Sequence, residues 1–172
     1  MKQFYLLVLA FLLFNYSFGQ SKYAKDVSSI ENLTKAYYDC ISGPIGEQRD
    51  FERFKNLFHP QAMFTYSYWS EEEQKSKLMI FDIEEYIGKL DYLDKRGFYE
   101  EELANQEVNY GSITQSLSTY RFWMEDKYAE GRGVTSYNYF FDGNRYWILS
   151  MFWQMESEQF PIPEELLNLK RN

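Results

Sequence analysis

Apolar residues recur at helical spacing in three stretches of the first half of the chain. The pattern predicts three helices: residues 29–41, a short helix capped by Asp50 and ending at His59-Pro60, and a helix from Asp82 to Arg96. Ser28 and Glu31 form a capping-box pair at the start of the first helix, and Ser42-Gly43-Pro44 ends it.

The remaining sequence has the alternating, aromatic-rich composition of strands. A first strand is expected at Ala62–Trp69, followed by a solvated charged loop over Ser70–Lys77. The second half is predicted to be mostly strand: Phe98–Tyr110, Ser112–Lys127, Gly133–Phe141 and Arg145–Glu156. Glu130–Gly133 and Asp142-Gly143-Asn144 are the expected turns, and a short helix is expected at Pro163–Leu169. Helices first and antiparallel strands afterwards indicate an α+β fold, with the helices on one face of a curved sheet.

The N-terminus has the three-part layout of a secretory signal peptide. Lys2 supplies a positive charge, Tyr5 to Phe14 form an apolar run, and small residues precede the expected cleavage site. A helix that spans a bilayer needs roughly 20 residues, so this run is too short to be an anchor. We therefore expect residues 1–19 to be removed. Residues 20–172 are then expected to form one domain without a membrane span, in the periplasm or outside the cell.

Charge and the scarcity of metal ligands disfavour several classes of protein. The formal net charge of −8 disfavours nucleic acid and anionic membrane surfaces as partners. The single cysteine, Cys40, forms no internal disulfide, and the single histidine, His59, cannot complete a usual zinc site with it. The sequence contains no EF-hand, phosphate-binding loop or dinucleotide motif. We predict no metal and no cofactor, and we expect Cys40 to be a small core residue.

Four stretches, in this order, resemble the nuclear transport factor 2-like superfamily in its bacterial, SnoaL-like branch. They are ENLTKAYYDCISGP, FERFKNLFHPQAMF, DIEEYI and GRGVTSYNYFFDGNRYWILSMFWQME. The resemblance covers residues 28–156. It implies a cone-shaped, cystatin-like fold: a curved, mostly antiparallel sheet wrapped around three helices, with a cavity at its open end. It also implies homodimers that pair through the outer face of the sheet. The same cone hosts isomerases, dehydratases, cyclases and non-enzymatic binding modules, so the resemblance assigns no catalytic residue.

His59 and Tyr66 are candidate cavity residues in the first half of the chain. His59 follows the second helix, near the expected mouth of the cavity, and a histidine there can act as a general base. The alternative is a histidine that caps the helix or bonds a neighbouring backbone group. Tyr66 alternates with Thr65 along the first strand, and an inward Tyr66 would offer its hydroxyl to a polar ligand or would simply belong to the core.

Glu107 and Arg121 are candidates from the strands of the second half. An inward Glu107 would have a raised pKa and could act as a base, whereas Glu101 and Glu102 are expected to be exposed edge charges. Strand parity places Arg121 with Leu117, which favours an inward clamp for a carboxylate or phosphate. A slip of one residue in register would turn Arg121 outward, to the surface or a dimer interface.

The last hairpin contributes Tyr139 and Trp153. If its turn has three residues, Tyr139 faces Trp147, and Trp147, Met151 and Trp153 share one face of the return strand. Such a face is either the cavity wall or the dimer seam.

Aromatic residues make up 20% of the chain, and they either line a cavity or serve as strand formers. Three functions remain open. The first is an exported domain that binds a small apolar or aromatic molecule. Such a domain can be a cofactor-independent acid–base enzyme of the isomerase, dehydratase or cyclase kind. His59 and one carboxylate would then be the acid–base pair. The second is non-catalytic binding at the cell envelope, and the third is a structural dimer whose cone is filled by side chains.

Overall fold

The computed structural model describes residues 22–170, so the predicted leader lies outside the described residues. The helices are α2 (Ile30–Ile41), α3 (Phe51–Leu57), α4 (Ile83–Gly88), α5 (Leu93–Arg96) and α6 (Glu164–Leu167). The strands are β1 (Phe58–Ser70), β2 (Lys75–Phe81), β3 (Phe98–Tyr110), β4 (Ile113–Met124), β5 (Glu130–Phe141) and β6 (Tyr146–Met155). Across residues 22–170, each helix is too short or too polar to cross a membrane.

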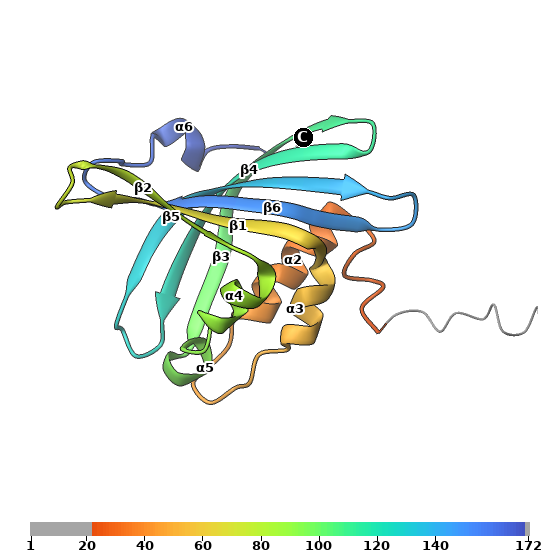
Figure 1. The fold of residues 1–172 in the computed structure, drawn as a ribbon, viewed down its shortest axis with the longest axis horizontal. Coiled ribbons are helices and arrows are strands. Elements are labelled where there is room, and N and C mark those ends of the chain that lie inside the picture. Colours follow the sequence, from red (N-terminus) through yellow and green to blue (C-terminus); the bar gives the residue numbers. More distant parts are fainter. Residues whose placement is uncertain (1–21, 171–172) are drawn as a thin grey trace, which may run out of the picture.

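The six strands form one sheet in the order β2-β1-β6-β5-β4-β3. Neighbouring strands are antiparallel except β1 and β6, which run parallel. Figure 1 shows a strongly curved sheet with α2, α3, α4 and α5 against one face and α6 on the other. We call these the inner face and the outer face. The predicted α+β fold, a curved and mostly antiparallel sheet around helices, is therefore confirmed.

The first helix begins one residue later than its predicted cap. Ser29, not Ser28, is the N-cap, and its side chain accepts a hydrogen bond from the Asn32 backbone at 3.1 Å. Ser28 instead donates its hydroxyl to the Lys25 carbonyl at 2.8 Å. The apolar stripe of α2 packs into the core, where burial raises the pKa of the Cys40 thiol to about 12. Cys40 is thus the small core residue that the sequence predicts.

The third predicted helix is divided into two short ones. Asp82 and Glu85 form the predicted capping box at the start of α4. The first of them, α4, ends at Gly88. The chain then turns back toward the sheet, and this turn buries Leu90 and Leu93 in the core. The second short helix, α5, then leads into β3.

Two predicted connections, the charged loop over Ser70–Lys77 and the turn at Glu130–Gly133, differ from the structure. The charged segment after β1 makes only a tight turn, and Lys75–Phe81 then pairs back along β1 as an edge strand. Lysines are common on edge strands, where they discourage pairing with another chain, so the charges of this segment do not exclude a strand. The expected turn at Glu130–Gly133 is the beginning of β5, and the turn lies between Met124 and Glu130.

The two glycines at the start of β5 make room for aromatic rings. A Cβ on Gly133 would overlap the Tyr120 hydroxyl and lie 2.7 Å from the Gln154 carbonyl oxygen. A Cβ on Gly131 would lie 3.0 Å from the Phe122 ring. The rings of β4 therefore lie across β5, which explains why glycines occur inside a strand.

The last hairpin has a loop one residue longer than predicted. Phe141 pairs with Tyr146, so Tyr139 faces Ile148 and Trp147 faces Phe140. The Asp142 carboxylate stabilises the longer loop by accepting bonds from the two backbone amides at 144 and 145. Further along, the pairing shifts between Asn138–Ser150 and Tyr139–Ile148, which leaves Leu149 as an extra residue on β6. This bulge turns Trp147 away from the face that Met151 and Trp153 share, so the prediction for Trp147 is wrong.

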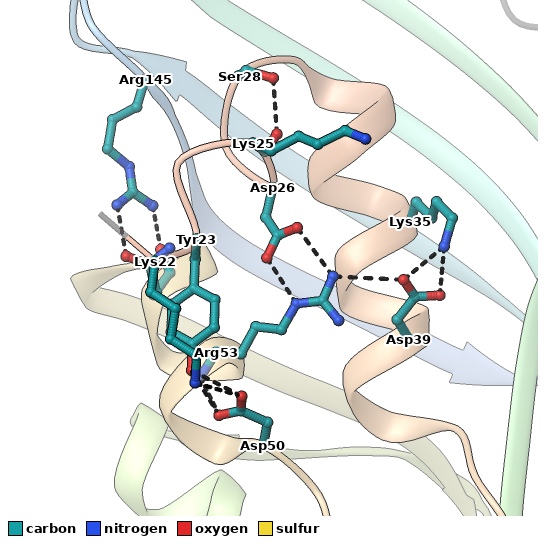
Figure 2. Close-up of polar contacts among 11 residues, drawn as sticks. Lys22, Tyr23, Lys25, Asp26, Ser28, Lys35, Asp39, Asp50, Arg53 and Arg145 are labelled. Carbon is teal, nitrogen blue, oxygen red and sulfur yellow. Dashed lines mark hydrogen bonds and ion pairs between the residues drawn. The ribbon is translucent and has the colours of Figure 1, made fainter. Parts of the chain in front are cut away.

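Polar contacts fasten the N-terminal residues of the described chain to the helices (Figure 2). Arg53 of α3 donates two hydrogen bonds to Asp26, at 2.7 and 3.0 Å, and lies 3.5 Å from the Asp39 carboxylate of α2. The Tyr23 hydroxyl donates to the Asp50 carboxylate at 2.8 Å. Removing one partner of such an ion pair destabilises the folded protein. These contacts therefore make the N-terminal segment part of the fold.

Candidate functional site

A cavity of about 380 Å³ lies between the helices and the inner face of the sheet. Nine of its eighteen lining residues are aromatic, and only Lys89 and Glu100 are charged. Small-molecule sites commonly combine an apolar wall with a few polar groups, and this cavity has that character. The volume also argues against a cone that is filled by side chains at this end.

Glu100 of β3 is the acidic group of the cavity wall. Burial raises the pKa of its carboxyl to about 8, because the charged form loses its hydration there. Within residues 22–170, no side chain donates a hydrogen bond to this carboxyl and no cation pairs with it. The group is therefore largely protonated at neutral pH and available to a ligand.

The backbone of Glu100 is held by the end of α2. The Ser42 hydroxyl accepts a hydrogen bond from the Glu100 amide at 3.0 Å and donates to the Glu100 carbonyl at 3.3 Å. One residue further along α2's exit, Gly43 exchanges two backbone hydrogen bonds with Phe98, at 2.8 and 3.1 Å. The Ser-Gly-Pro breaker that ends the helix thus also fixes the position of the acidic residue.

Tyrosines surround this carboxyl. Burial, and secondarily the charge of Glu100, raises the pKa of Tyr92 and Tyr120, while burial and Tyr86 raise that of Tyr37. The hydroxyls consequently stay protonated at neutral pH and can donate hydrogen bonds to a ligand. The cavity interior is therefore rich in neutral donors around one carboxylic acid.

Glu102, two residues along β3, is a useful contrast. Its carboxylate faces the same side but accepts hydrogen bonds from Asn105 at 2.7 Å and Ser118 at 2.8 Å. The expectation that Glu102 is an exposed edge charge is therefore wrong. Because its bonds are satisfied within the sheet, Glu102 has a structural role that Glu100 lacks.

Two of the predicted candidates, Tyr66 and Trp153, line the cavity. They are opposite each other on β1 and β6, and their rings stack with centroids 5.6 Å apart. The Tyr66 hydroxyl contacts the Met155 sulfur at 3.7 Å. Together they form the part of the wall that the first and last strands provide.

His59 does not belong to the cavity wall. Its ring packs edge-on against Trp147 at 5.7 Å, and its Nδ1 accepts a hydrogen bond from the Gln61 amide at 3.2 Å. The structure thus favours the alternative in which His59 bonds a neighbouring backbone group. The acid–base candidate of the cavity is Glu100, which the sequence analysis did not single out.

Arg121 lies on the outer face, so of the two alternatives that the sequence left open, the structure favours the exposed charge over the inward clamp. It is exposed, forms an ion pair with Glu101 on the adjacent strand, and lies 5.5 Å from the centroid of the Trp123 ring. Its neighbours Tyr120 and Phe122, together with Met124, are the residues of β4 that line the cavity.

Glu107 and Tyr139 lie elsewhere in the cone. Glu107 is half-buried opposite Ser116, beyond the lining of the cavity. Tyr139 is a core residue, 1% exposed, whose ring stacks on Tyr137 and whose hydroxyl lies 3.5 Å from the Thr34 hydroxyl. Neither residue contributes to the cavity wall around Glu100.

A curved mixed sheet that encloses helices, with a cavity between them, is the fold of the nuclear transport factor 2-like superfamily, and solved structures of that class resemble this one. A nuclear transport factor 2-like protein of unknown function from Pseudomonas putida has a TM-score of 0.56 and 10% identity, over 78% of this chain and 90% of that one. A protein of unknown function with a cystatin-like fold from Nostoc punctiforme has a TM-score of 0.57 and 10% identity, over 75% and 90%. A proposed dehydratase of the family from Streptomyces avermitilis has a TM-score of 0.56 and 10% identity, over 77% and 96%.

These similarities show the fold alone, because the identities are low. No family model matches the sequence, and no curated protein matches it either. Within the described residues, no group of three or more His, Cys, Asp or Glu side chains is placed to hold a metal ion. The function must therefore be argued from the cavity.

Proposed function

We propose that this chain is an exported domain that binds a small, largely apolar molecule in the aromatic cavity, with Glu100 as its acid–base group. The observation that carries the proposal is a carboxyl group without a partner that faces a cavity of about 380 Å³. Burying an ionisable group without a hydrogen-bonding or charged partner costs stability, and perturbed carboxyls in cavities are typical of functional sites.

The chemistry follows from the pKa of about 8 for this carboxyl. The protonated form donates a hydrogen bond to a carbonyl oxygen of the ligand. The ionised form removes a proton from the carbon next to that carbonyl, and the C–H electron pair moves into an enolate that the tyrosine hydroxyls stabilise. Return of the proton to the same carbon gives exchange, and return to another carbon gives an isomerisation. Each cycle restores Glu100 without a cofactor.

The test uses indanone, a fused-ring ketone of suitable size, in deuterated water. We expect the wild-type protein to exchange the hydrogens next to the ketone for deuterium faster than buffer does, as followed by NMR. Glu100→Gln should lose this exchange, whereas Glu101→Gln, the same substitution at the next residue but on the outer face, should keep it. Binding of indanone without exchange would reject the proposed enzymatic activity and would leave the proposal of a non-catalytic binding domain. Absence of binding would reject both.

The export part of the proposal is supported by the layout of residues 1–19. Expression of the full chain in a bacterium, followed by fractionation and mass spectrometry, should give a protein that begins near Gln20 outside the cytoplasm. An uncleaved chain in the cytoplasm would contradict it.

We also propose that a second copy of this chain pairs with the outer face of the sheet. Ile80 (56% exposed) and Phe152 (48% exposed) lie in one row across that face, separated by Thr65. The C-terminal segment passes beside this row: residues 160–163 border a groove that Phe152 also lines, and the Thr119 hydroxyl donates to the Leu166 carbonyl at 2.6 Å. Light scattering should show a dimer for the wild type and a monomer for Phe152→Glu. A wild-type monomer would contradict this pairing.

A further inference from the structure

Lys89, the second charged residue of the cavity wall, is exposed and lies just after α4. Its backbone amide donates to the Tyr86 carbonyl at 2.9 Å, which fixes the residue at the end of the helix. Its ammonium lies 4.8 Å from the centroid of the Phe81 ring, another part of the wall. Helix and ring together hold the positive charge at the rim of the cavity.

This ammonium has no carboxylate partner within residues 22–170. Lysines in an acidic chain pair readily, and six others do so here: Lys22, Lys35, Lys55, Lys75, Lys77 and Lys95. Lys89 instead rests on an aromatic ring at the entrance of an apolar cavity. A cation in that position is available to an anion that enters with a ligand.

The two ends of the cavity therefore differ in chemistry. At the inner end, Glu100 and the tyrosines offer neutral donors, and an anionic group placed there would meet the carboxyl and make its ionisation still harder. At the rim, Lys89 offers a positive charge in contact with solvent. Complementary placement of charge fixes the orientation in which such a ligand binds.

We propose that the ligand carries a carboxylate, which Lys89 binds at the rim while its rings fill the aromatic wall and its opposite, uncharged polar end reaches Glu100. This inference rests on the proposed function and specifies the class of molecule: a carboxylic acid with a one- or two-ring apolar body and a carbonyl at the far end.

The test compares three probes that share one fused ring system: an indanone carboxylate, its primary amide, and the indane carboxylate that lacks the ketone. Calorimetry measures their affinities for the wild type, for Lys89→Met, and for the control Lys25→Met. Lys25 is exposed and lies in the N-terminal segment, away from the cavity wall. The Met side chain keeps the apolar stem of lysine and removes the charge.

We expect the carboxylate to bind the wild type and Lys25→Met about fivefold more tightly than the amide, as for a partly exposed ion pair. Lys89→Met should remove this preference and leave the affinity for the amide unchanged. Equal affinity for carboxylate and amide in the wild type, or a preference that survives in Lys89→Met, would overturn the inference and leave the proposed function intact. Failure of all three probes to bind the wild type would overturn the inference together with the proposed function.

Discussion

Glu100→Gln keeps the size and shape of the side chain in the cavity and removes its ionisation. The pKa of this carboxyl is raised from 4.5 to about 8 in the folded chain, so the folded state binds the proton more tightly than the unfolded state. The resulting stability is fully present below the unfolded pKa and is lost as the pH rises toward 8. With about 1.4 kcal/mol for each unit of pKa, the wild type loses up to ~5 kcal/mol across this window.

The glutamine variant cannot lose this stability, because its side chain does not ionise. We expect the free energies of unfolding of wild type and variant to agree near pH ~3.5, below the unfolded pKa, and to diverge at pH ~9, where the variant is more stable by up to ~5 kcal/mol. Urea denaturation followed by tryptophan fluorescence measures both, and other titrating groups cancel in the difference. Glu101→Gln is the matched control and should show no such divergence. A difference between wild type and Glu100→Gln that changes by less than ~0.5 kcal/mol over this range would refute the reasoning.

Three further substitutions test the structure around the cavity. Ser42→Ala removes the hydroxyl that bonds both backbone groups of Glu100, and urea denaturation should show a loss of about 1–2 kcal/mol; no loss would contradict that anchoring role. Gly133→Ala places a methyl group against the Tyr120 hydroxyl, so we expect the free energy of unfolding to fall by about 1–3 kcal/mol and indanone to bind more weakly. Unchanged binding would show that the position of the Tyr120 ring does not depend on the space at Gly133. Arg53→Met leaves two carboxylates without their guanidinium, so hydrogen exchange should accelerate in residues 22–28, and equal exchange rates would argue that the segment is held by other contacts.

The helices and their order could be predicted because their signals are local. Periodic apolar residues, the Asp82–Glu85 capping box and the Ser42-Gly43-Pro44 breaker all lie where the structure uses them. The edge strand β2 could not be recognised in the same way, because Lys75, Ser76 and Lys77 continue the charged segment and the apolar run after them does not alternate with polar residues.

The site was harder to predict because strand faces depend on the whole sheet. Arg121 does share a face with Leu117, as parity requires, but that face is the outer one, and its apolar residues are covered in part by the C-terminal segment. On β3 a bulge between Glu102 and Ala104 changes the parity partway along the strand. Before the bulge, every second residue counted from Phe98 faces inward, and Glu100 is one of these residues. One local feature could have indicated that Glu100 faces inward: it lies two residues after Phe98, the aromatic residue that begins the strand.

The ionisation of Glu100 in the folded protein decides whether this carboxyl can be the acid–base group of the cavity. NMR of protein with isotope-labelled glutamate side chains reports each carboxyl carbon during a pH titration, and the signal missing from Glu100→Gln assigns the residue. We expect a midpoint near 8 for this carboxyl, because burial in the aromatic cavity disfavours its charge. A midpoint near the ordinary 4.5 would mean that the group is hydrated or paired, and would contradict its role as the acid–base group of the cavity.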